Sequence, residues 1–135
     1  MPKYFALEEL LYSKKAIDNK IQNIPSWQVV DNLEELATCI LDPLREKLGS
    51  PISVTSGFRS VKLNEFVKGS PSSQHLYGQA ADITCKNNKL LFEIAKEMIE
   101  KGEIIVGQLI DEKNYSWIHI SLPNEDHKNH IFHLK

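Results

Sequence analysis

Residues 69–84 read GSPSSQHLYGQAADIT, and this stretch decides how the chain folds around its polar centre. Its first five residues have the composition of a loop, because glycine, serine and proline favour turns. Gln79–Thr84 then predicts a strand that small residues bury. The spacing between His75 and Asp82 suits a loop histidine and a strand aspartate that converge on one point. Gly78 between them would let the backbone pass close to a bound metal.

Upstream of this stretch, apolar residues recur with a helical period. Phe5–Tyr12 has the pattern of a short amphipathic helix. Trp27–Leu48 has the pattern of a long helix, which Gly49 ends. Pro43 should kink or split this helix, because proline lacks a backbone donor and clashes with the preceding turn. Cys39 falls on its apolar stripe, so we expect a buried free thiol there.

Downstream, strands alternate with helices and a hairpin follows. The predicted elements are a strand at Pro51–Ser56, a helix at Ser60–Lys68, a helix over Leu90–Ile99, and strands at Ile104–Ile110 and Trp117–Leu122 around the turn Asp111–Ser116. This order predicts an α+β fold, a small largely antiparallel sheet with helices packed on it. The length of 135 residues fits a single domain that spans residues 1–135.

The overall composition excludes several function classes. Sixteen basic and eighteen acidic residues give a net charge of −2, and no basic block favours nucleic acid as a partner. Every apolar run is far shorter than the roughly 20 residues that span a bilayer. The first residues lack the continuous apolar segment of a secretory signal. We therefore expect a monomer that is cytoplasmic as synthesised.

A third polar segment, Trp117–Ser121, reads WIHIS and places a histidine in a strand. His119 lies between two isoleucines and should face away from both. Zinc hydrolases typically use three protein ligands and leave a position for water, so His75, Asp82 and His119 are candidate ligands. A histidine and a carboxylate can equally form a simple hydrogen bond in a metal-free structural domain. The spacing alone leaves both interpretations open.

The segments SGFRS, SSQHLYGQAADI and WIHIS together resemble the zinc D-alanyl-D-alanine carboxypeptidase family of metallopeptidases, peptidase family M15. This family also includes L-alanyl-D-glutamate endopeptidases of phage lysins. The likeness is greatest to short single-domain members from phages and mobile elements, and it extends to about Ser121. It implies the fold of the hedgehog and DD-peptidase group. It also implies one Zn²⁺ ion held by His75, Asp82 and His119.

The resemblance also assigns roles around the metal. Arg59 matches the family arginine that polarises the scissile carbonyl and stabilises the anionic intermediate. Ser73 and Gln74 would lie beside the substrate backbone. Many members carry Glu or Asp three residues before the last histidine, but here that position is Ser116. We expect Glu112, rather than its neighbour Asp111, to act as the general base from the adjacent strand.

These roles favour a zinc metallopeptidase that hydrolyses an amide bond in peptidoglycan stem peptides, either a D-Ala-D-Ala carboxypeptidase or an endopeptidase. Such a protein would be phage-encoded or released to act on the cell wall. The alternative is a catalytically silent zinc module that binds cell wall or serves in phage or mobile-element assembly, because Ser116 cannot take up a proton.

The C-terminal tail carries three histidines, His127, His130 and His133. Their spacing would allow a second metal site, but their charged and polar setting favours a solvated tail. The apolar residues among them, from Ile131 to Leu134, would allow a terminal edge strand.

Overall fold

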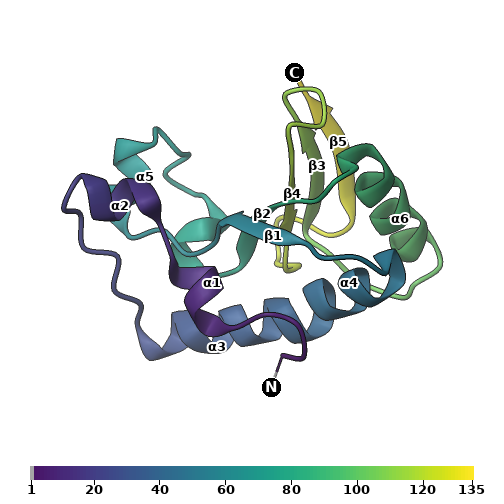
Figure 1. The fold of residues 1–135 in the computed structure, drawn as a ribbon, viewed down its shortest axis with the longest axis horizontal. Coiled ribbons are helices and arrows are strands. Elements are labelled where there is room, and N and C mark those ends of the chain that lie inside the picture. The colour runs from purple at the N-terminus through teal and green to yellow at the C-terminus, as the bar shows by residue number, and fades with distance from the viewer. Residues whose placement is uncertain (1) are drawn as a thin grey trace.

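The computed structural model describes residues 2–135, in which a five-stranded sheet has the order β1-β2-β4-β3-β5 (Figure 1). The strands are β1 (Ser53–Ser56), β2 (Ala80–Thr84), β3 (Gln108–Glu112), β4 (Trp117–Ser121) and β5 (His130–Leu134). The helices are α1 (Leu7–Leu11), α2 (Lys14–Asp18), α3 (Trp27–Leu36), α4 (Asp42–Leu48), α5 (Val61–Phe66) and α6 (Asn88–Glu100). All neighbouring strands are antiparallel except β3 and β5. The predicted α+β fold with a largely antiparallel sheet is confirmed.

The long predicted helix is continuous in path but changes its winding before Pro43. A π-helical turn, η1 (Ala37–Leu41), joins α3 to α4, and the Asp42 N–H donates to the Ala37 carbonyl five residues back. Pro43 then lies in the first turn of α4, where its missing donor costs little. Gly49 closes α4 with a φ of 76°. The sequence correctly predicted an irregularity at Pro43 and the helix end at Gly49.

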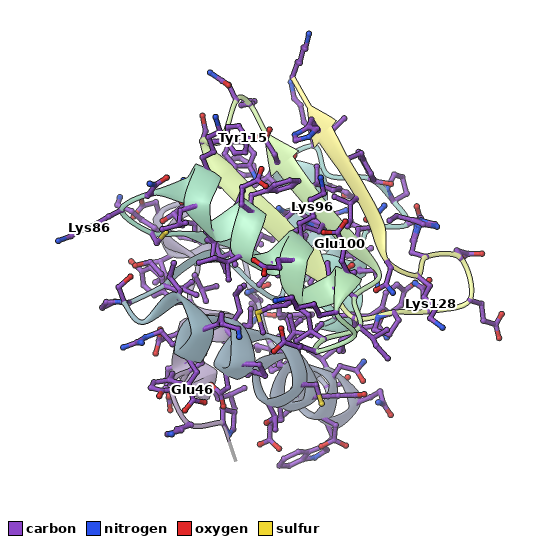
Figure 2. All side chains as sticks on the ribbon, turned by 90° about the vertical axis from the view of Figure 1, so that its right-hand side faces the viewer. Glu46, Lys86, Lys96, Glu100, Tyr115 and Lys128 are labelled. Atoms are coloured by element: carbon purple, nitrogen blue, oxygen red, sulfur yellow. The ribbon has the colours of Figure 1, made fainter. Side chains whose placement is uncertain are left out.

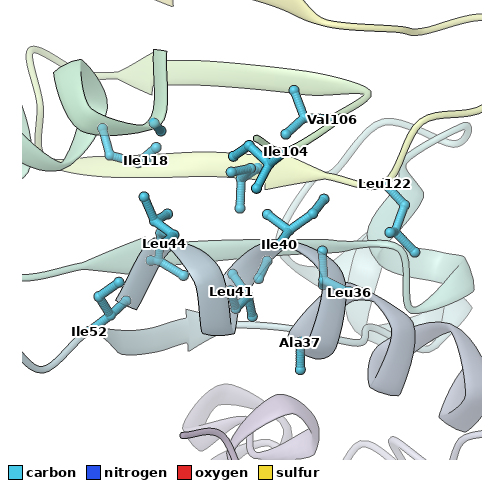
Figure 3. Close-up of a cluster of buried hydrophobic side chains, with 14 of the residues drawn as sticks. Leu36, Ala37, Ile40, Leu41, Leu44, Ile52, Ile104, Val106, Ile118 and Leu122 are labelled. Atoms are coloured by element: carbon cyan, nitrogen blue, oxygen red, sulfur yellow. The ribbon is translucent and has the colours of Figure 1, made fainter. Parts of the chain in front are cut away.

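The core lies between one face of the sheet and the helices. Figure 3 shows Leu36, Ile40 and Leu44 on the α3–α4 path pointing towards the sheet. Ile118 of β4 belongs to the same buried cluster, and α6 covers the rest of the same face. Figure 2 shows Lys96 and Glu100 on the outward side of α6. Each fully buried Leu or Ile contributes about 1.5–3 kcal/mol, so this face anchors the sheet and leaves the other free.

One local prediction was wrong, and one short helix was not predicted. Cys39 is exposed, because Leu36, Ala37 and Ile40 take the buried side of the path and Cys39 falls on the outer side. The polar stretch after α1 contains the short helix α2, whose start is capped by Ser13 accepting from the Ala16 N–H.

The C-terminal residues form strand β5, which pairs in parallel with β3 at the sheet edge. This confirms the terminal edge strand that the apolar tail residues allowed. No helix within residues 2–135 is both long and apolar enough to cross a membrane.

Candidate metal centre

Strand register brings two of the three candidate ligands together. Asp82 of β2 pairs with His119 of β4, so both side chains project from the same face of the sheet. Ile110 of β3 pairs with His119 on the other side, and Ser56 of β1 pairs with Asp82. These four paired residues form a row across the sheet on the face opposite to the core, as the alternation of side chains around His119 predicts.

His75 reaches the same point from a short 3-10 turn, η2 (Gln74–Tyr77). The Ser73 hydroxyl oxygen caps this turn by accepting from the His75 N–H at 3.2 Å. Gly78 ends it with a φ of 71°, and a Cβ there would lie 2.7 Å from the Val29 carbonyl oxygen. Only glycine fits this close left-handed position, so the turn that presents His75 depends on it.

The two ring nitrogens of His75 have different surroundings. Nδ1 lies 2.7 Å from the Gly57 carbonyl oxygen, so it carries the proton and donates. Nε2 is buried, has no hydrogen-bond partner among the described residues, and lies 3.3 Å from Asp82 Oδ1. Metal-binding histidines usually donate their second ring N–H to a carbonyl or carboxylate in this way. The arrangement leaves a lone pair aimed at the centre.

His75, Asp82 and His119 form a compact buried group. His119 Nδ1 lies 3.1 Å from Asp82 Oδ1, and the three ligand atoms all lie within 4.8 Å of one another. Two histidines and one carboxylate form a donor set that suits Zn²⁺ and leaves a fourth position open. The residues present therefore fit a single zinc ion.

Charge in the cluster favours an ionised aspartate. Burial raises the pKa of Asp82, but the larger opposing effect of the neighbouring His119 and His75 holds it well below its usual range. The carboxylate thus stays deprotonated at neutral pH, as a metal ligand must be.

Arg59 is held rigidly beside the cluster. Its Nη2 lies 3.3 Å from Asp82 Oδ2, its Nε donates to Ser56 Oγ at 3.1 Å, and its Nη1 donates to Asn64 Oδ1 at 3.2 Å. Burial lowers the pKa of Arg59, while Asp82 and Glu112 act in the opposite direction. An arginine normally keeps its charge, so this side chain is a fixed cation next to the candidate ligands.

Glu112 and Asp111 project to opposite faces of β3. Glu112 pairs with Trp117, whose Nε1 donates to Glu112 Oε2 at 3.2 Å, on the same face as His119. Asp111 is buried on the other face, where it accepts from the Tyr115 N–H and lies 2.9 Å from His133 Nδ1. Of the two carboxylates, only Glu112 faces the candidate metal centre.

The cluster lies in a cleft of about 970 Å³. Arg59, Glu112, Ser73 and Gln74 all line it. Gln74 Nε2 already donates to the Leu122 carbonyl at 2.8 Å, whereas its buried Oε1 has no partner among the described residues.

Three supporting residues were missing from the sequence-based assignment. Ser56 and Asn64 hold the Arg59 guanidinium, and Trp117 holds Glu112. The pairing of Trp117 with Glu112 follows from the predicted hairpin once its register is known. Asn64 gave no signal, because its position five residues after Arg59 matches no regular pattern.

The tail histidines lie apart from the three candidate ligands. The Nδ1 atoms of His127 and His130 lie 3.3 Å apart, and His127 is partly exposed whereas His130 is exposed. His133 pairs with Asp111. His127 lines the cleft, but the structure does not group any of the three with the buried cluster.

Comparison with known proteins adds an independent finding. The chain is 48% identical over 44 residues to a zinc D-Ala-D-Ala carboxypeptidase from Streptomyces albus G. That match covers 32% of this chain and 17% of the relative, so it spans only a small part of the relative's length. The profile of the peptidase M15 family matches residues 3–121, which include all three candidate ligands, Arg59 and Glu112. The chain belongs to the peptidase M15 family.

Proposed function

We propose that this protein is a zinc-dependent metallopeptidase that hydrolyses an amide bond in peptidoglycan stem peptides. The observation that carries the proposal is the buried cluster of His75, Asp82 and His119 in a cleft that Arg59 and Glu112 also line. Membership of the peptidase M15 family and the partial match to a zinc carboxypeptidase support it. The proposal covers cleavage either at the carboxyl end of the stem peptide or within it.

The three ligand side chains would hold one zinc ion, a Lewis acid that polarises a carbonyl and makes water more acidic. Arg59 supplies a second positive charge close to the same point. Because Ser56 and Asn64 fix its guanidinium, little reorganisation is needed when negative charge develops on the scissile carbonyl oxygen. Arg59 therefore acts as the oxyanion-stabilising residue.

Glu112 is the general base in this proposal. Its carboxylate faces the cleft and takes a proton from the attacking water, then delivers that proton to the leaving amine. The hydrogen bond from Trp117 Nε1 occupies Oε2 and orients the group, which leaves Oε1 free for the proton.

Ser73 and Gln74 position the substrate backbone. The Ser73 hydroxyl oxygen accepts from the His75 N–H, so its own proton is free to donate to a substrate carbonyl. Gln74 Oε1 is buried without a partner among the described residues, so it would accept from a substrate N–H after the side chain turns towards the cleft. Together they would align a peptide along the cleft.

A catalytically silent zinc module that binds cell wall is the second candidate. Ser116 favours it, because the resemblance to the family predicts a carboxylate at this position, whereas the Ser116 hydroxyl only donates to the Lys113 carbonyl in the β3–β4 turn. Glu112 on the neighbouring strand must replace that carboxylate for hydrolysis to occur.

The deciding experiment incubates the zinc-loaded protein with purified peptidoglycan and detects new amines and carboxyl termini by mass spectrometry. The wild type should release products, and Glu112→Gln and His119→Ala should release none. Glu100→Gln, a matched change on the outward side of α6, should leave the products unchanged (Figure 2). If the wild type sediments with the wall without forming products, the silent module is correct.

A further inference from the structure

The charged residues that line the cleft are mostly basic, although the chain as a whole is slightly acidic. Four lysines and one arginine line the cleft, against one aspartate and one glutamate. The complete chain has 16 basic and 18 acidic residues and a net charge of −2. The positive charge is therefore concentrated where a substrate would bind.

The lysines stand on both sides of the cleft. Lys14 and Lys15 belong to α2, and Lys68 follows α5, on the left of Figure 1. Lys113 follows β3, in the β-rich part on the right. A ligand that spans the cleft would meet positive charge at both of its ends.

Groups of the protein itself leave most of this charge uncompensated. Lys14 pairs with Asp18 at 2.6 Å, on the surface. Among residues 2–135, Lys15, Lys68 and Lys113 have no carboxylate within 4.0 Å. The two acidic cleft residues are engaged elsewhere, Asp82 with the histidines and Arg59, and Glu112 with Trp117.

We infer that the cleft selects acidic peptides, which carry free carboxylates on both sides of the scissile amide, over the same peptides with amidated carboxyl groups. This inference rests on the proposed peptidase function and names the charge state of its substrate. A cleft lined by one sign of charge concentrates ligands of the opposite sign and speeds their association. Lys15 and Lys68 would contact one carboxylate, and Lys113 the other.

The test compares two synthetic stem peptides that differ only in whether their side-chain carboxyl groups are free or amidated. Their equilibrium affinities are measured at low and high salt for the zinc-loaded Glu112→Gln protein, which by the proposed function binds the peptide without turnover, and the lysine variants are made in the same background. The acidic peptide should bind about fivefold more tightly at low salt, as a few exposed charge pairs allow, and the advantage should shrink as salt rises. The Lys15→Gln/Lys68→Gln double variant should lose most of it.

The matched control is Lys86→Gln/Lys96→Gln, which removes the same charge from lysines outside the cleft (Figure 2). It should keep the preference. Equal binding of the two peptides, or an equal loss in the control, would overturn the inference. A phosphate-bearing polymer, poly(glycerol phosphate), is tested as a competitor; if it binds while the acidic peptide does not, the inference is wrong.

Failure of this inference and failure of the peptidase function are separable, because binding is measured without turnover. Hydrolysis of both peptides with equal kcat/KM would reject the charge preference and keep the peptidase. A binding preference without hydrolysis of either peptide would support the preference and reject the peptidase.

Discussion

His75 Nδ1 lies 2.7 Å from the Gly57 carbonyl oxygen, and this hydrogen bond directs the other ring nitrogen towards Asp82. Gly57 is packed so closely that a Cβ there would lie 2.1 Å from the Leu10 carbonyl oxygen. The position of its carbonyl is therefore fixed by backbone packing. This packing orients the histidine ring.

Replacing His75 should remove the zinc site. His75→Ala deletes a buried donor that already points at the cluster, so zinc affinity should fall at least about 100-fold, as expected for loss of a ligand. Competition with a chromophoric chelator measures it. His130→Ala, which removes an exposed histidine, should bind about one equivalent as tightly as the wild type does. Unchanged affinity in His75→Ala would refute the assignment.

The stability of the metal-free protein should depend on Asp82 at low pH. The folded state holds the pKa of Asp82 below its unfolded value of about 3.9, so the unfolded chain binds this proton first as pH falls. This contribution is fully present above the unfolded pKa and declines below it. Urea unfolding from pH 5 to pH 2 should show a shallower decline for Asp82→Asn than for the wild type. Asp126→Asn, on the surface, should match the wild type, and equal slopes in all three would contradict the prediction.

Arg59 should affect catalysis more than metal binding. Arg59→Gln removes the fixed cation, and kcat/KM on a stem peptide should fall about 100-fold, the usual cost of losing one oxyanion-stabilising group. Zinc content, measured by atomic emission, should stay near one equivalent. Arg45→Gln is a suitable control, because Arg45 stacks on Tyr4 away from the cleft. If zinc is also lost, the contact from Arg59 serves to position Asp82 instead.

Asp111 and Glu112 should respond in opposite ways to loss of their charge. Asp111→Asn weakens two partly buried hydrogen-bonding contacts, to Tyr115 and His133, and should lower the free energy of unfolding by about 1 kcal/mol. Its zinc affinity should not change. Glu112→Gln should leave stability nearly unaffected while abolishing activity. Urea unfolding and the peptidoglycan assay distinguish them, and a stable but inactive Asp111→Asn would reverse the two roles.

The sequence by itself determined the elements whose signals are local. The apolar period marked α3 and α6, alternation marked β1 and β4, and Pro43 and Gly49 marked the break and the end of the long helical path. The candidate ligands were also visible, because their segments are unusually polar for their surroundings. These features depend on neighbours within a few residues, so pattern alone could identify them.

Tertiary structure decided what depends on distant pairing. The helical period predicted that Cys39 is buried. It is exposed, because other residues of the π-helical turn face the core. Whether Asp111 or Glu112 faces the candidate ligands depends on which residue of β3 pairs with His119. A slip of one residue would exchange their faces, because successive side chains of a strand alternate. The sequence therefore determined which residues could form the centre, and the register of the folded sheet decided which of them face it.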